Sequence, residues 1–160
     1  ILTALLHVGA TLRLARKNRA ARPVGYSARG NVQLSLGART MVMTGLLVLA
    51  YVVYHLLHFT LYVTEPGFAQ LTDAQGRHDV HAMMVLGFRH TPVALAYVVA
   101  NALLAFHLMH GTRSFLQTLG FHPDASPTLR SVGPLLAFLL FAGFSSIPLT
   151  IQLGWITIAG

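Results

Sequence analysis

The segment Met41–Val63, MVMTGLLVLAYVVYHLLHFTLYV, contains 23 residues and no formal charge. As one α-helix it is long enough to cross a hydrocarbon core of roughly 30 Å. It also contains two histidines, His55 and His58. Because ionisable residues inside membrane-spanning helices are rare and commonly functional, both side chains are candidate site residues.

The whole chain has the composition of a helical membrane protein. Of its 160 residues, 54% are hydrophobic and 9% are charged, whereas a soluble domain carries about 25% charged residues. A membrane β-barrel is excluded because its strands need alternating polar and apolar residues, which the sequence lacks. We therefore expect an all-α, polytopic transmembrane helix bundle.

The chain contains no cysteine, so it can form no disulfide, zinc–thiolate site or cysteine-ligated iron–sulfur cluster. Nine histidines remain as the main possible metal ligands. The net charge of +7 is concentrated rather than spread evenly. We interpret it as a signal of membrane topology, and we expect no nucleic-acid partner.

Charged and turn-forming residues separate further apolar segments. Residues 1–12 are apolar but reach only about 18 Å as a helix, which is too short to span. We expect them to be the end of a spanning helix that begins before Ile1. Two more spans are expected, at 92–109 and within 131–160, and Pro148 should kink the last one.

The basic residues indicate the orientation of these spans. Segment 13–39 contains seven basic residues, no acidic residue and the helix breaker Pro23, so we expect a cytoplasmic loop. Segment 111–130 is expected to be a second cytoplasmic loop. The slightly acidic loop 65–90 then faces outward, and it should contain a short interfacial helix at 79–88.

Two histidines are expected at matching depth in the bilayer. His7 lies six residues before Arg13, and His107 lies six residues before Arg113. Because both helices run towards the cytoplasm, both imidazoles should lie about 9 Å inside their basic anchors. Two histidines at one level, on different helices and in apolar surroundings, point to a b-type haem with two histidine ligands.

His55 is expected at a different level. It lies sixteen residues beyond Arg39, which places it roughly 24 Å from the cytoplasmic side. It therefore cannot share a metal with His7 and His107. As a ligand, it would belong to a second haem near the outer face, with a partner upstream of Ile1.

Structural roles remain alternatives for these histidines. A histidine in a helix can simply donate to a neighbouring backbone carbonyl, and this explains His55 equally well when it is taken alone. We favour a structural role for His58 and His110. The other histidines are expected in loops, either solvated or interfacial: His78, His81, His90 and His122.

Several short motifs occur together along the chain. They are Leu6-His7 followed by Gly9, the segment 30–41 (GNVQLSLGARTM), Thr44-Gly45 with His55 and Thr64-Glu65-Pro66, and the segment 105–115 (AFHLMHGTRSF). In this order they resemble the single-chain, dihaem cytochrome b subunit, of the b558 type, of succinate dehydrogenases and fumarate reductases.

The resemblance implies a bundle of five transmembrane helices. This chain would contain the end of the second helix (1–14), the third (40–63), the fourth (91–118) and the fifth (131–158). The resemblance assigns His7 and His107 to the proximal haem and His55 to the distal haem. The partner of His55 would be a histidine on the first helix, which this sequence lacks.

The resemblance also implies a function. The chain would be the membrane anchor of a succinate:quinone oxidoreductase in the prokaryotic inner membrane, with loops 13–39 and 111–130 in the cytoplasm. Electrons would pass from a flavoprotein subunit through an iron–sulfur subunit and two b haems to a membrane quinone. Arg39, Ser35 and Arg113 are candidate donors to the haem propionates.

One position departs from the family and two other functions remain open. Some fumarate reductases have a proton-conducting glutamate two residues before the fourth-helix histidine, where this chain has Ala105. The chain could also anchor another quinone-linked enzyme, such as a hydrogenase or formate dehydrogenase, or be a haem-free anchor. Its basic segments could contact anionic membrane lipid.

Overall fold

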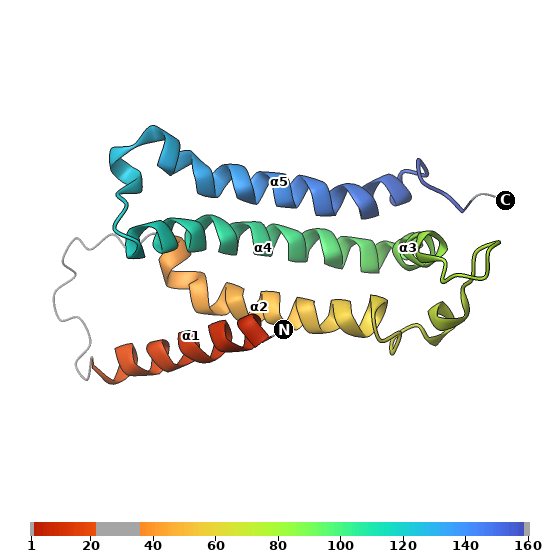
Figure 1. The fold of residues 1–160 in the computed structure, drawn as a ribbon, viewed down its shortest axis with the longest axis horizontal. Coiled ribbons are helices and arrows are strands. Elements are labelled where there is room, and N and C mark those ends of the chain that lie inside the picture. The colour runs from red at the N-terminus through yellow and green to blue at the C-terminus, as the bar shows by residue number, and fades with distance from the viewer. Residues whose placement is uncertain (1, 22–35, 159–160) are drawn as a thin grey trace. The chain divides into compact units, whose positions relative to one another are not determined.

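The structure is a computed structural model that describes residues 2–21 and 36–158. Within these ranges the chain is helical and contains no strand, which confirms the all-α prediction. The elements are α1 (Leu2–Ala20), α2 (Leu36–Phe59), η1 (Pro66–Gln70), α3 (Val80–Arg89), α4 (Thr91–Thr118), η2 (Pro123–Ala125) and α5 (Pro127–Gln152) (Figure 1). They belong to two compact units, Ile1–Met43 and Thr44–Gly160.

In the first unit, α1 extends further than the sequence suggested. The expected helix end at residue 14 and the expected loop from Arg13 were wrong, because the helix continues through Lys17 and Arg19. Lysine and arginine are good helix formers, and cations near a helix C-terminus interact favourably with its dipole. The helix ends at Ala20, before Pro23, whose ring disfavours a helical residue ahead of it.

Three helices are long and apolar enough to cross a membrane, as far as length and composition decide: Thr40–Phe59, Thr91–Thr118 and Pro127–Gln152. The helix 91–118 that the resemblance implied coincides with α4 at both ends. The shorter span expected at 92–109 and the loop expected at 111–130 were wrong in their bounds, because α4 continues to Thr118 and α5 begins at Pro127. The expected spans 40–63 and 131–158 each overlap one of these helices, but the ends of the helices lie at other residues than expected. The short helix expected at 79–88 is present as α3, with the Asp79 carboxylate accepting a hydrogen bond of 2.8 Å from the Ala82 N–H.

The end of α2 comes four residues earlier than expected, because a capping turn replaces its last turn. The Leu61 N–H donates to the Leu56 carbonyl and the Val63 N–H to the Leu57 carbonyl, both at 2.8 Å. Tyr62 between them has a φ of 55°, a left-handed conformation that is costly for a tyrosine. Its hydroxyl lies 3.2 Å from Nε2 of His78, which helps to hold it in place.

The helix α5 begins earlier and ends earlier than expected. Ser126 caps its start by accepting from the Leu129 N–H, and Pro127 at the first helical position has a backbone angle suited to a helix. At the other end Gly154 has a φ of 73°, which suits a helix-terminating glycine. Pro148 lies inside the helix, and the kink expected there stays a prediction.

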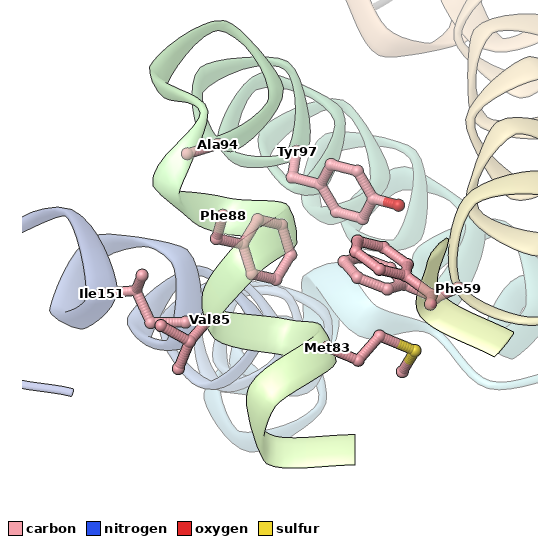
Figure 2. Close-up of a cluster of buried hydrophobic side chains, with 8 residues drawn as sticks. Phe59, Met83, Val85, Phe88, Ala94, Tyr97 and Ile151 are labelled. Atoms are coloured by element: carbon pink, nitrogen blue, oxygen red, sulfur yellow. The ribbon is translucent and has the colours of Figure 1, made fainter. Parts of the chain in front are cut away.

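Within the second unit, α4 and α5 lie side by side and antiparallel (Figure 1). Gly133 of α5 permits a close approach, because a Cβ there would lie 2.9 Å from the Met109 carbonyl oxygen of α4. At the other end of the pair, α3 packs on both helices. Figure 2 shows Val85 of α3 directed towards Ile151 of α5, and Phe88 directed towards Tyr97 of α4.

The junction between α3 and α4 is tied to α5 by one glutamine. Pro92 has no N–H, so the Phe88 carbonyl lacks the donor that a continuous helix would supply four residues later. The side-chain amide of Gln152 donates to the Phe88 carbonyl at 2.5 Å and to the Arg89 carbonyl at 3.2 Å. The Gln152 side-chain oxygen in turn accepts from the Thr91 hydroxyl at 3.0 Å.

Candidate functional site between α2 and α4

Polar side chains connect α2 and α4 at three levels among the described residues. The donors and acceptors on α2 recur every seven residues, so they lie on one face of the helix. The pairs are Thr44 with His107 (3.2 Å), Tyr51 with Asn101 (3.2 Å) and His58 with Tyr97 (3.1 Å). All three lie within the unit Thr44–Gly160.

The first level contains His107, the predicted ligand of the proximal haem. Its Nδ1 shares a hydrogen bond with the hydroxyl of Thr44, which is only 4% exposed. A Cβ on Gly45 would lie 3.1 Å from Cε1 of His107, so the glycine makes room for the imidazole. Metal-binding histidines typically have their second ring nitrogen hydrogen-bonded in this way.

The second level connects three helices. The Tyr51 hydroxyl donates to Oδ1 of Asn101, and Nδ2 of Asn101 lies 3.3 Å from Oγ of Ser145 on α5. Asn101 is 3% exposed and Ser145 is 1% exposed. Since unpaired polar groups in an apolar interior are costly, this chain of bonds fixes the rotation of all three helices.

The third level is aromatic. His58 is buried, its Nδ1 lies 3.1 Å from the Tyr97 hydroxyl, and its ring centroid lies 4.0 Å from that of Phe59. A Cβ on Gly87 of α3 would lie 2.8 Å from the Phe59 ring. The surroundings of His58 are those of a packed core histidine, the role favoured for it from the sequence.

His55 has different surroundings from His58, although both lie on α2. It is exposed rather than buried, and its ring lies 6.0 Å from those of Phe59 and Tyr97. It lines a cavity of about 260 Å³ together with Tyr51, Phe88, Asn101, Leu104, Phe144 and other apolar side chains. The cavity is bounded by α2, α3, α4 and α5.

His55 and His107 lie at different levels of the bundle. His55 contacts Tyr97, and Tyr97 is ten residues before His107 on the same helix. Ten residues of helix correspond to about 15 Å. No single metal ion can therefore contact both side chains.

The other predicted site residues are distributed as follows. His7 lies on α1, where its carbonyl accepts a hydrogen bond from the Thr11 hydroxyl. Since His7 and His107 belong to different units, their pairing stays a prediction. Ser35 and the side chain of Arg39 lie outside the described residues. Arg113 forms an ion pair with Asp124, at 2.7 Å.

A second cavity of about 280 Å³ lies at the same end of the bundle as His55. Its polar lining is supplied by His58, Glu65 and His90, and its apolar lining includes Phe68 and Leu86. The cavity lies between the end of α2 and α3. Its mixed lining suits a small ligand with an apolar body and a polar head.

Four residues that form hydrogen bonds in the second and third levels were not identified as site residues from the sequence: Tyr51, Tyr97, Asn101 and Ser145. A usable signal was present, because Thr44, Tyr51 and His58 are spaced by seven residues in an otherwise apolar helix. Asn101 is likewise a single polar residue in an apolar segment, and Ser145 lies beside Ser146 in another. In a membrane such residues commonly hydrogen-bond between helices.

Within the described ranges, no group of three or more histidine, aspartate or glutamate side chains could hold a metal ion. A haem iron needs at most two protein ligands, so this finding does not test the haem prediction. No family model matches the chain, and no curated protein or solved structure is significantly similar to it. Functional assignment therefore depends on the residues themselves.

Proposed function

We propose that this chain is the membrane-anchoring cytochrome b subunit of a succinate:quinone oxidoreductase. One observation carries the proposal: the imidazole of His107 is held at Nδ1 by Thr44, with Gly45 against its ring. A hydrogen bond at one ring nitrogen orients the imidazole, which is the support that metal-binding histidines typically have. Thr44, Gly45 and His107 all belong to the motifs that resemble the family.

The donor set fits a b-type haem. His107 and His7 would together hold one haem, while His55 would help to hold a second haem with a histidine upstream of Ile1. The sequence contains no cysteine or thiolate to compete for iron. A bound haem supplies a one-electron carrier, and the surrounding apolar helices would exclude water and influence its potential.

One feature supports a direction for electron transfer. Basic residues gather on α1 near its C-terminal end, including Arg13, Arg16, Lys17 and Arg19, and the positive-inside rule favours a cytoplasmic position for them. An iron–sulfur subunit, carrying electrons from a succinate-oxidising flavoprotein, would dock on that side. The haem that His107 would hold would then be the first to receive electrons, and the haem that His55 would hold would lie further along the route.

The quinone would bind at the outer end of the bundle. The cavity lined by Glu65, His58 and His90 has carboxylate and imidazole groups next to apolar walls. Quinone reduction needs protons as well as electrons, and carboxyl and imidazole groups can take up protons and pass them on. Glu65 and His90 would bind the quinone head and hold protons for it, while the buried His58 keeps its structural role.

Co-purification with partner subunits tests this assignment. The protein should be isolated with mild detergent from the membranes of its native host and assayed for succinate-dependent reduction of a soluble quinone. We expect a flavin-containing subunit, an iron–sulfur subunit and this activity in one complex. A hydrogenase or formate dehydrogenase catalytic subunit in that complex would contradict the proposal.

A haem-free anchor is the second candidate, and one observation favours it. Both His58 and His107 already have hydrogen-bond partners on the neighbouring helix, which is how polar residues join helices in a membrane. In that case Thr44 and His107 would only hold α2 against α4. Optical spectra of the oxidised and reduced protein separate the two candidates.

A further inference from the structure

The paired ends of α4 and α5 enclose a cavity with several charged side chains in its lining. It has a volume of about 170 Å³ and lies where α4 ends, η2 crosses and α5 begins. Its ionisable lining consists of His110, Arg113, Asp124 and Arg130. Because α4 and α5 both qualify as membrane-spanning helices, their paired ends lie near a membrane surface.

The charges of this cavity are unbalanced in favour of cations. The guanidinium of Arg113 is bonded to both carboxylate oxygens of Asp124, at 2.8 and 2.7 Å. Arg130, on the other side of the cavity, has no ion-pair partner in the part of the chain that the structure describes. A guanidinium is therefore available for an anion, and arginine suits phosphate oxygens particularly well.

An apolar groove continues from this cavity along the same two helices. It has a volume of about 290 Å³ and is lined by Ala102, Ala105 and Phe106 of α4 and by Ala137, Phe138 and Phe141 of α5. Met109 lines both the cavity and the groove. The two hollows are therefore neighbours that share a wall, one basic and one apolar.

The length of this composite site matches one half of a bilayer. Arg113 and Ala102 are eleven residues apart on α4, and Arg130 and Phe141 are eleven residues apart on α5. Eleven residues of helix correspond to about 16 Å. Half of a hydrocarbon core is about 15 Å, so the groove reaches from the membrane surface to the midplane.

We infer that α4 and α5 bind one anionic phospholipid, with its phosphate beside Arg130 and one acyl chain in the alanine-lined groove. Basic pockets between transmembrane helices are known to bind anionic head groups. The small side chains of Ala102, Ala105 and Ala137 leave space for a methylene chain. A free phosphate ion would bind Arg130 but would leave the groove empty. A zwitterionic lipid would fill the groove, but its head group would carry no net negative charge to bind Arg130.

Binding measurements on the delipidated full-length protein test this inference. Native mass spectrometry would compare phosphatidylglycerol, phosphatidylcholine with the same acyl chains, and inorganic phosphate. We expect phosphatidylglycerol to bind most tightly. Arg130→Gln should weaken its binding about fivefold, whereas the charge-matched control Arg89→Gln on α3 should not.

The groove is tested separately from the cation. Ala102→Leu fills the groove and should weaken phosphatidylglycerol binding, whereas Ala142→Leu, at an exposed position that does not line the groove, should leave it unchanged. Equal binding of the two lipids, or equal effects of Arg130→Gln and Arg89→Gln, would overturn the inference. Inorganic phosphate binding as tightly as phosphatidylglycerol, or an unaffected Ala102→Leu variant, would also overturn it in favour of a free-anion site.

Discussion

The Thr44 hydroxyl of α2 lies 3.2 Å from Nδ1 of His107 of α4. The two residues are far apart in sequence, and Thr44 is almost completely buried. The bond fixes the ring orientation and makes Nδ1 the anchored nitrogen. In the proposed haem site, this bond would orient the ring before a metal binds, which is the usual role of such an outer partner.

Replacing Thr44 with valine removes this hydroxyl while nearly preserving side-chain volume. We expect Thr44→Val to lower metal affinity at His107 about 10- to 100-fold, because the ring loses its orienting partner. The measurement is haem content per protein after purification, with the midpoint potential of any remaining haem. Thr128→Val, at an exposed position in the first turn of α5, is the matched control. Equal haem content in both variants would show that Thr44 does not support a ligand.

A methyl group at Gly45 should disturb the same imidazole. The Cβ of Gly45→Ala would lie 3.1 Å from Cε1 of His107, whereas a Cβ at Gly143 meets nothing within 4 Å. Gly143→Ala should therefore stabilise the protein by up to about 1 kcal/mol through helix propensity. Gly45→Ala should not gain this stability, because its methyl group would press against the imidazole. It should also change the optical spectrum of the haem that His107 would hold. Thermal unfolding and spectra of both variants check this, and an unchanged Gly45→Ala spectrum would contradict it.

Removing the amide of Gln152 should destabilise the junction of α3 and α4. Gln152→Leu leaves the Phe88 carbonyl without its side-chain donor, because Pro92 cannot supply one. An unsatisfied buried carbonyl costs about 1–3 kcal/mol. Thermal unfolding should show a lower midpoint for Gln152→Leu than for Gln117→Leu, at an exposed position on α4. Equal midpoints would mean that another group satisfies the carbonyl.

The turn at Asp73 should loosen only in acid. Hydrogen bonds from the Arg77 backbone N–H and guanidinium hold the pKa of Asp73 below its usual value of 3.8. Because the pKa is lowered, the ionised carboxylate stabilises the turn fully at pH values above the pKa of the unfolded state. The stabilisation is lost as the pH falls through the pKa of the folded state. Protection of the Arg77 amide from hydrogen exchange, corrected for the intrinsic rate, should stay constant from pH 7 to near 4 and fall below that. Asp73→Asn should remove the pH dependence.

The spans were predictable because an uncharged run of about 20 residues has few alternatives to a membrane helix. Their ends were less predictable, since they depend on individual hydrogen bonds. The end of α2 is set by a left-handed Tyr62 bonded to His78, sixteen residues away. The start of α5 is set by the Ser126 cap and Pro127, which were interpreted as loop residues.

The different levels of His55 and His107 were predictable from the sequence, but the surroundings of the histidines were not. Spacing from basic anchors separated His55 from His107 in depth, and the two side chains do lie at different levels of the second unit. Hydropathy does not give the rotation of a helix, so it could not show that His58 is buried while His55 lines a cavity. The bond between Asn101 and Ser145 depends on which helices are neighbours, which composition does not reveal.

The difference spectrum of the reduced and oxidised protein tests the central claim most directly. The protein should be purified with its partner subunits as wild type, as His107→Ala and as His110→Ala, the last being a histidine one turn of α4 further on. The account predicts a b-type α-band in the wild type, loss of one haem in His107→Ala and no loss in His110→Ala. The absence of any α-band in the wild type, or an unchanged haem content in His107→Ala, would contradict it.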